Sequence, residues 1–443
     1  MTNSTPSSQN LQEAPETQIT RRIIAEDPKW TLSTVPLLSE ICQKTIVKNF
    51  KKYPILDELP DDKQKKIVLD ALPVNLPLSV TTNLIEDENY WKRVVKARWP
   101  LLIPDQSENS TGTDNWKQLF FENHFKNICE FYLPSEDEED RLTKNGVEKP
   151  KNTADIIALA KLTYNYIENL DIDQLLPSAT NDQCNDHLNF EKVLPHLQKL
   201  KSLQLSYQVK NCGMNFEWRL FEFTETDCHS LSKGILALKN TLSSITLTRS
   251  SLKDNLCRTF CAYMLKHNNL TNLDLSRNEI SNSGARGVAK LMTTLPSLKS
   301  VKLGDNRIDD EGVKAIGNAF TKDKCQVEHL ELQLNSFSDE AAAQLISNLK
   351  FNTTLKSLNL ACNQINELSI ESLCLILTNN KTLTSLDFSG NEFGVQTGRM
   401  LQEGLENNKS ISEINIKLTG TGAENEYTIQ CIVGNNKAQL EGR

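Results

Sequence analysis

The sequence predicts an α/β solenoid with a parallel sheet on one face and helices on the other. Three observations predict this fold class. The motif LxxLxLxxNxI recurs with first positions at 242, 270, 298, 327, 355, 383 and 411. The steps between successive copies are 28, 28, 29, 28, 28 and 28 residues. Between the motifs the apolar spacing changes to that of a helix, as in GARGVAKLMTTL from Gly284.

Each motif predicts one short strand and the turn that follows it. In the copy LTNLDLSRNEI, Leu270, Leu273 and Leu275 are expected to point into the stack, because side chains alternate along a strand. Asn278 is expected to close the turn by giving its side-chain amide to backbone groups. The equivalent residues in the other copies are Asn306, Asn335, Asn363 and Asn391, with Ser250 and Thr419 in the first and last copies.

The pattern resembles the leucine-rich repeat, and the period of 28 residues resembles its ribonuclease-inhibitor-like subclass. A single repeat cannot bury its leucines alone, so the copies are expected to stack into a solenoid. The repeat domain is expected over residues 190–443. A weaker copy at Leu200, Leu203 and Leu205 is interpreted as its N-terminal cap, and the segment after Thr419 as the opposing cap or a final strand.

The residues that face outward from successive strands predict a small, polar and mildly acidic surface. The central column is Thr246, Asp274, Lys302, Glu331, Asn359, Asp387 and Asn415, and its neighbour is Ser244, Asn272, Ser300, His329, Ser357, Ser385 and Glu413. Such a face suits a protein ligand better than nucleic acid, which favours Arg, Lys and aromatic side chains. The candidate protein-binding residues are Asn272, Asp274, Lys302, His329, Glu331, Asn359 and Asp387. The alternative is that much of this face is only solvated.

The N-terminal third predicts an all-α module that precedes the solenoid. Residues 1–20 are rich in polar residues and proline and are expected to be disordered. The helical module is expected over 21–180, with an acidic linker near 134–152. Its expected helices include one from about Trp116 to Leu133 and one from about Thr153 to Leu170.

An aromatic and basic stripe runs from Tyr90 to Trp99 in this module. Trp91, Val94, Val95 and Trp99 share one helical face. We interpret this face as packing in a core, because large aromatic side chains more often fill a core than bind nucleic acid.

Composition and motifs argue against several function classes. A formal net charge of -8 and a pI near 5.5 argue against general affinity for nucleic acid. The sequence has no HExxH, GxxxxGK[ST] or GxSxG pattern, so we expect no enzyme activity, no metal and no cofactor. Eleven cysteines without a CxxC pattern predict buried, reduced thiols. The polar N-terminus and the lack of a long apolar run predict a protein of the cytosol or a continuous compartment, not of a membrane.

Two long phrases carry a more specific resemblance. RRIIAEDPKWTLSTVPLLSEICQKTIVKNF and LPLSVTTNLIEDENYWKRVVKARW resemble the N-terminal region of the t-complex-associated testis-expressed leucine-rich-repeat family, subunits of the nexin-dynein regulatory complex of motile cilia. The similarity covers residues 21–180 by phrase and the remainder by repeat period. The resemblance implies a non-catalytic scaffold in the axoneme of the cilium or flagellum. Such a subunit links doublet microtubules and helps regulate dynein-driven motility, with other subunits, doublet microtubules or dynein components as partners.

Two alternatives rest on architecture alone. LPDDKQKKIVLDALP from Leu59, followed by Trp91, vaguely resembles an F-box, a module often joined to leucine-rich repeats in substrate receptors of ubiquitin ligases. The same repeat subclass also occurs in activators of the nuclear-transport GTPase. We favour the scaffold because extended matching phrases carry it, whereas one architecture serves many functions.

Overall fold

The computed structural model describes residues 37–102, 115–132, 150, 152–177, 187–215 and 217–442. The chain divides into two compact units, Met1–Tyr90 and Trp91–Arg443. The expected disordered tail and most of the expected acidic linker lie outside the described residues.

The first unit is helical where the structure describes it. Its helices are α1 (Leu38–Asn49), α2 (Asp62–Ala71) and α3 (Leu78–Leu84), and α4 (Glu88–Arg98) begins at its end. Helix α2 begins after Asp61, whose carboxylate accepts a hydrogen bond from the Gln64 backbone amide at 2.7 Å. The buried apolar side chains of the first unit are Phe50, Leu56, Val68, Leu72, Ile85 and Tyr90.

Helices also precede the sheet within the second unit. They are the rest of α4, η1 (Pro100–Leu102), α5 (Trp116–Glu130) and α6 (Thr153–Thr163). Trp91, Val94 and Val95 are buried, and the Trp91 ring centroid lies 5.0 Å from that of Phe120 in α5. Trp99 also contacts Phe120, with 5.7 Å between ring centroids. The interpretation of this stripe as a packing face is therefore confirmed.

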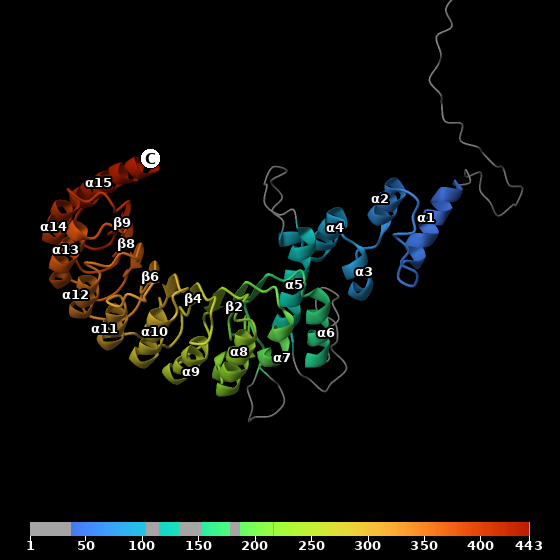
Figure 1. Ribbon diagram of the computed structural model, residues 1–443, viewed down its shortest axis with the longest axis horizontal. Helices are drawn as coiled ribbons and strands as arrows, with labels where there is room; N and C mark the ends of the chain where they lie inside the picture. Colours follow the sequence, from blue (N-terminus) through green and yellow to red (C-terminus); the bar gives the residue numbers. More distant parts are fainter. Residues whose placement is uncertain are drawn as a thin grey trace, which may run out of the picture. The chain divides into compact units, whose positions relative to one another are not determined.

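Nine parallel strands form one sheet in sequence order among the described residues (Figure 1). They are β1 (Asn169–Ile172), β2 (Ser202–Leu205), β3 (Ser244–Leu247), β4 (Asn272–Asp274), β5 (Ser300–Lys302), β6 (His329–Glu331), β7 (Ser357–Asn359), β8 (Ser385–Asp387) and β9 (Glu413–Asn415). The register pairs equivalent repeat positions, for example Leu273 with Val301 and Asp274 with Lys302. The repeat leucines are buried and the residues between them face outward, as the period-2 pattern predicts.

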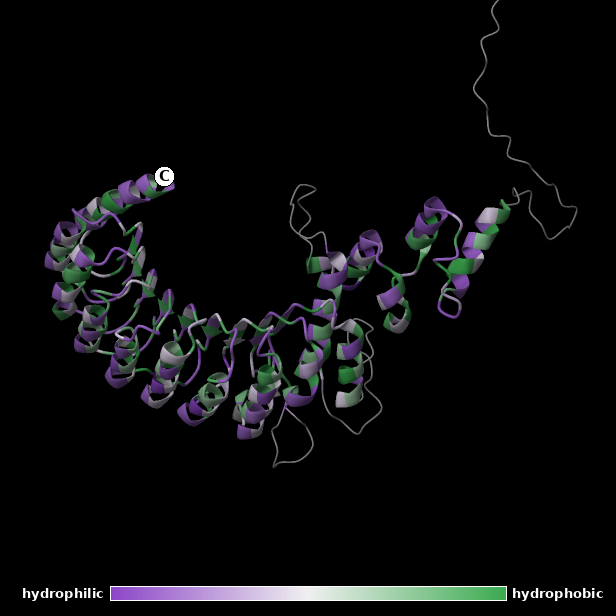
Figure 2. Cartoon of the chain, viewed as in Figure 1, coloured by the Kyte–Doolittle hydropathy of each residue, from purple (hydrophilic) through white to green (hydrophobic). Residues whose placement is uncertain are grey.

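Helices cover the other side of the strands and form the outer layer of the second unit (Figure 1). They are α7 (Phe190–Val193), η2 (Leu194–His196), η3 (Gly213–Asn215), η4 (Trp218–Phe221), α8 (Glu225–Ala237), α9 (Asp254–Met264), α10 (Asn282–Thr294), α11 (Asp310–Ala319), α12 (Asp339–Asn348), η5 (Glu367–Ser369), α13 (Ile370–Asn379), α14 (Val395–Leu405) and α15 (Ala423–Glu441). Each helix from α8 to α15 packs against its sequence neighbours. Figure 2 shows hydrophilic residues along this outer layer.

The repeat asparagines form a ladder of hydrogen bonds between neighbouring turns. The Asn363 side-chain amide donates to the carbonyl of Leu332 in the preceding repeat at 3.1 Å and to that of Leu360 in its own repeat at 3.0 Å. Its side-chain oxygen accepts from the Asn335 backbone amide at 3.0 Å. Asn278, Asn306, Asn335 and Asn391 make equivalent bonds. Backbone groups that the bent chain leaves unpaired are thus satisfied from the next turn.

A second ladder links the helices. A side chain at the start of one helix accepts hydrogen bonds from backbone amides at the start of the next helix. Asp254 of α9 accepts from Ser281 at 2.8 Å and from Gly284 at 2.9 Å. The same role falls to Asn282, Asp310 and Asp339 in the three helices that follow. The starts of α10, α11, α12 and η5 therefore receive hydrogen-bond acceptors from the preceding helix, which adds a polar contact to the apolar packing.

Three expectations about the ends of the solenoid need correction. The helix expected from Thr153 to Leu170 ends at Thr163, and Asn169–Ile172 forms the first strand, because polar and apolar residues alternate there. The copy containing Leu203 is not a cap, since β2 pairs with strands on both sides. Of the two alternatives for the segment after Thr419, the final strand is wrong: the segment forms helix α15, which packs against α14 and β9 as an opposing cap would.

The compact units also differ from the expected division into 21–180 and 190–443. Helices α5 and α6 belong to the same compact unit as the repeats. The reason is visible at the edge of the sheet, where α5 packs against β1.

Candidate functional site

The outward columns of the strands form the candidate site. The candidate residues Asn272, Asp274, Lys302, His329, Glu331, Asn359 and Asp387 lie on five successive strands, β4 to β8. The register aligns the central column across these strands, and Asn272 and His329 fall in the neighbouring column. The structure therefore brings all seven onto one face of the sheet. Asn272 and His329 are exposed, and the other five are half-buried.

One ion pair divides the central column. Lys302 Nζ lies 2.8 Å from Glu331 Oε1 on the next strand. The pKa of Lys302 is raised by its hydrogen bond to Glu331, against the effect of partial burial, and the negative charge of Asp274 raises it further. Glu331 also accepts a hydrogen bond from Gln333 at 3.4 Å. This ion pair holds Lys302 and Glu331 together in the middle of the face. Asp274 and Asp387, on either side of the pair, are not part of it.

Asp387 and Asn359 are held by local hydrogen bonds. Asp387 accepts from the Ser389 backbone amide at 2.9 Å and from the Asn415 side chain at 3.0 Å. Asn359 accepts from the Ala361 backbone amide at 3.0 Å. These bonds orient the side chains along the sheet, so the column presents fixed acceptors to any partner.

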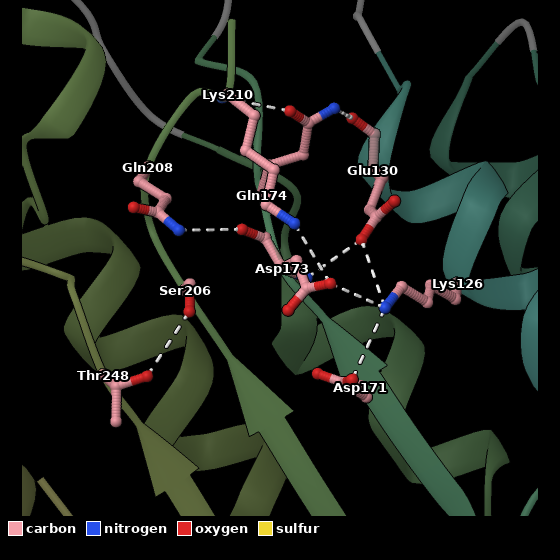
Figure 3. Close-up of polar contacts among 9 residues, drawn as sticks. All are labelled: Lys126, Glu130, Asp171, Asp173, Gln174, Ser206, Gln208, Lys210 and Thr248. Carbon is pink, nitrogen blue, oxygen red and sulfur yellow. Dashed lines mark hydrogen bonds and ion pairs between the residues drawn. The ribbon is translucent and has the colours of Figure 1, made fainter.

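A network that sequence reasoning missed lies at the N-terminal edge of the same sheet (Figure 3). Lys126 of α5 places its Nζ 2.9 Å from Asp173, 3.4 Å from Asp171 and 3.7 Å from Glu130. Glu130 accepts a hydrogen bond from the Asp173 backbone amide at 2.9 Å. Lys210 approaches Asp173 from the other side, at 3.1 Å. Helix α5 is thus tied to β1 by charge, and no repeat motif could have indicated it.

The pKa values in this network follow from burial and charge. Burial raises the pKa of Glu130 and outweighs the opposing hydrogen bond from the Asp173 backbone. Burial acts to raise the pKa of Asp173, but the hydrogen bonds from Lys126 and Lys210 outweigh it and hold this pKa low. Burial acts to lower the pKa of Lys126, and its hydrogen bond to Asp173 and the surrounding carboxylates raise it overall.

The edge of β1 is also closed by α5. Glu122 of α5 accepts hydrogen bonds from the backbone amides of Glu168, at 3.1 Å, and Asn169, at 2.8 Å. A terminal strand otherwise presents unpaired backbone groups that invite pairing with another chain. Helix α5 therefore caps the solenoid, a role that sequence reasoning assigned to the copy at Leu203.

A groove of about 990 Å³ opens beside β3 and β4. One wall is the segment Phe221–Glu225, which belongs to the insertion between the repeats of β2 and β3. The other wall includes Arg249 and Arg277, both exposed, with φ values of 51° and 60°. The unusual spacing of 42 residues between Leu200 and Leu242 was the signal for this insertion.

The described residues contain no group of three or more His, Cys, Asp or Glu side chains placed to hold a metal ion. His329 is exposed on the sheet face, and no hydrogen bond joins it to Glu331 within the described part of the chain. None of the described helices is both long enough and apolar enough to cross a membrane.

The repeats match a family model described as Leucine Rich repeat, over residues 266–289, 294–317, 351–374 and 379–396. Together with the parallel sheet and its stacked helices, this match shows a leucine-rich-repeat solenoid preceded by a helical N-terminal region. An internalin structure from Listeria monocytogenes is 20% identical, covers 62% of this chain and 68% of its own, and has a TM-score of 0.34.

Curated relatives named Dynein regulatory complex subunit 5 are similar over a longer span. The Mus musculus protein is 38% identical over 286 residues, which cover 60% of this chain and 53% of the relative. The Chlamydomonas reinhardtii protein is 32% identical over 225 residues, which cover 50% of this chain and 49% of the relative. The chain thus spans about half the length of the curated relatives that it matches.

Proposed function

We propose that this chain is a non-catalytic scaffold subunit of the axonemal dynein regulatory complex. Its role is to link doublet microtubules and to help regulate dynein-driven motility of cilia and flagella. The observation that carries the proposal is 38% identity over 286 residues to relatives named as subunit 5 of that complex. Other subunits of the complex are its partners, and doublet microtubules or dynein components are further candidates.

The concave face of the sheet is the partner-binding surface in this proposal. Its acidic residues Asp274, Glu331 and Asp387 lie in the central column on alternate strands, β4, β6 and β8. Lys302 is the one lysine or arginine among the seven candidate residues. A rigid face with fixed acceptors loses little conformational entropy on binding, which favours association.

The two alternative functions have no support in the comparisons. Every curated relative described above is named as a dynein regulatory complex subunit, not as a ubiquitin-ligase receptor or a GTPase activator. The F-box resemblance rests on α2 and a single tryptophan, Trp91, which packs against Phe120 and Phe121 in the second compact unit. That packing explains the tryptophan without a ligase adaptor.

Localisation tests the function as a whole. A tagged copy of the full chain, expressed in ciliated cells, should lie along the axoneme and co-purify with other subunits of the complex. A copy that stayed in the cell body, with no subunit recovered, would contradict the proposal.

Charge reversal tests the concave face. Asp274→Lys with Asp387→Lys should weaken recovery of partners by roughly tenfold or more. A partner that binds an acidic face carries basic side chains, and the new lysines would repel them. The matched control is Glu371→Lys with Glu403→Lys, which changes the net charge equally on exposed outer positions of α13 and α14. Thermal melts of both variants check that the solenoid stays folded. Equal recovery with both variants would count against a concave contact.

A further inference from the structure

A second charged surface lies on the outer helices, away from the strands. Basic side chains there form a stripe across four successive helices: Lys233 of α8, Arg258 of α9, Arg286 and Lys290 of α10, and Lys314 of α11. Arg258, Arg286 and Lys314 occupy equivalent repeat positions, each 28 residues after the last. The repeat therefore places one cation on each of three neighbouring helices in register. We call these five residues the basic stripe.

The basic stripe stands out against the rest of the chain. The formal net charge is -8, and the concave face is acidic. Past α11 the same register position carries Ala343, Glu371 and Arg399, so only one of the three is a cation, and Glu340, Glu403 and Glu406 are exposed nearby in the sequence. The cations are therefore concentrated on α8 to α11 and do not reflect a general excess.

Three of the five cations in the stripe form ion pairs, and two form none among the described residues. Arg286 lies 3.2 Å and Lys314 3.8 Å from Glu311, and Lys233 lies 3.4 Å from Glu191. Arg258 and Lys290 are exposed and have no acidic partner within the described part of the chain. Two unpaired cations on adjacent helices attract an anionic partner at little cost, because no existing ion pair must break.

A groove of about 520 Å³ separates α9 and α10 within the stripe. Arg258, Arg286 and Lys290 line it, together with the apolar residues Ala262 and Leu265. Gly287 also lines the groove, and an added Cβ there would make ordinary van der Waals contact with the Cys261 side chain, at 3.5 Å. An apolar base between cations fits a protein segment that carries both acidic and apolar side chains.

We propose that the basic stripe docks an acidic α-helix of a partner protein. Packed helices lie about 8–10 Å apart, and seven residues of an α-helix rise about 10.5 Å. A partner helix laid across α9, α10 and α11 can therefore bring an acidic side chain to each helix once every seven residues. Apolar side chains between them enter the groove beside Gly287.

Nucleic acid fits this surface less well. A nucleic acid duplex carries a charge about every 1.7 Å along its axis and is held by many cations. The stripe offers few, and Glu311 lies among them, 3.2 Å from Arg286. The apolar base of the groove would also meet no complementary surface on a phosphate backbone.

The first test compares two peptides on the unmodified full chain. One is a synthetic helix of about four heptads with glutamate at every seventh position and leucine beside it; the other has the same composition in shuffled order. Fluorescence anisotropy should show binding of the first peptide about tenfold tighter than the second, and weaker at high ionic strength. Equal affinity for both peptides, no binding of either, or tighter binding of a DNA duplex of the same length would overturn the proposal.

Variants then locate the contact. Arg258→Gln with Lys290→Gln should weaken peptide binding by about tenfold, whereas Lys381→Gln with Lys409→Gln, a matched loss of two exposed cations elsewhere, should not change it. Gly287→Leu keeps every charge, fills the groove and should weaken binding as well. Binding that both stripe variants retain would place the peptide elsewhere and reject the assignment. Because the stripe lies on the helices, its failure leaves the proposed role of the concave face untouched.

Discussion

The interior repeats and the N-terminal edge of the sheet solve the same physical problem in different ways. From β4 to β8 each turn is completed by the next copy of the repeat, which supplies leucines, an asparagine and a helix cap. Strand β1 is the first strand among the described residues, and helix α5 covers its free side with Glu122, Lys126 and Glu130. An interior repeat is stabilised by contacts with neighbouring copies of the same motif. The N-terminal edge of the sheet is stabilised by residues that lie outside the motif.

The largest expected difference concerns the buried leucines. Leu303→Ala should lower the free energy of unfolding by about 2–5 kcal/mol, because Leu303 is fully buried and the rigid stack cannot close around the cavity. Urea unfolding followed by circular dichroism measures it. The control is Leu418→Ala, since Leu418 is 88% exposed and should change stability by less than about 0.5 kcal/mol. An unfolding curve for Leu303→Ala that matched the parent would show that the register is wrong.

The turn after β3 has Ser250 at the position where the interior turns have asparagine, so the two kinds of turn should differ in stability. Asn363→Ala should cost about 2–3 kcal/mol, since it removes the side-chain hydrogen bonds to the carbonyls of Leu332 and Leu360 and takes away the acceptor of the Asn335 backbone amide. Ser250→Ala should cost about 1–2 kcal/mol, because its hydroxyl makes fewer bonds: it donates to the Thr248 carbonyl at 2.8 Å and accepts from the Tyr207 backbone amide at 3.0 Å. The same urea titrations measure both. Equal costs would remove the distinction between the two ways of closing a turn.

The cap at β1 is expected to be weaker than the interior. Lys126→Met should cost about 1–2 kcal/mol, because Glu130 loses the cation that pairs with it and Asp173 keeps only Lys210. Hydrogen exchange should show faster opening of β1 amides, with little change in β5 to β7. Lys409→Met, at an exposed position, serves as the control. Faster exchange spread evenly along the sheet would mean that the cap and interior unfold together.

Acid should loosen the helix ladder of the interior. The folded-state pKa values of Asp254 and Asp310 lie below the usual value, because hydrogen bonds from the next helix outweigh burial. Their contribution is therefore present above the ordinary Asp pKa and is lost as pH falls through the folded pKa. Asp254→Asn with Asp310→Asn should cost about 1 kcal/mol at neutral pH and flatten the loss of stability between about pH 5 and pH 3.

The pH dependence at the edge has the opposite sign at one residue. The pKa of Glu130 is raised, so its protonation favours the folded state as pH falls. Glu130→Gln should therefore remove a contribution to the free energy of unfolding that grows as pH falls. Asp254→Asn with Asp310→Asn should remove a contribution that shrinks as pH falls. Unfolding curves at several pH values compare the two, and parallel pH profiles would contradict this assignment.

The smallest effect is expected on the concave face. Lys302→Gln breaks the ion pair with Glu331, but both side chains are partly exposed, at 41% and 30%. Exposed pairs contribute little, so the change in stability should stay below about 0.5 kcal/mol. A larger loss of stability would mean that the Lys302–Glu331 pair helps to hold the solenoid together, in addition to any role in binding a partner.

The candidate site was predictable to the extent that it repeats. Asp274, Lys302 and Glu331 could be placed on one column from the spacing of the leucines alone, because alternation along a strand fixes which residues face outward. Lys126 and Asp173 could not be paired in that way, since they lie 47 residues apart outside the motif. The groove beside Arg249 likewise depends on an inserted segment whose conformation no period describes.

The sequence by itself determined the register of the strands, the outward columns and the position of each turn asparagine, because stacking makes every repeat depend on a local pattern copied from its neighbour. Only the tertiary structure decided how the stack begins and ends: that Asn169–Ile172 is the first strand, that α5 covers it, and that the chain after Thr419 closes with a helix. Terminal contacts join segments that are distant in sequence and unique in composition, so their geometry is settled by packing and charge in three dimensions.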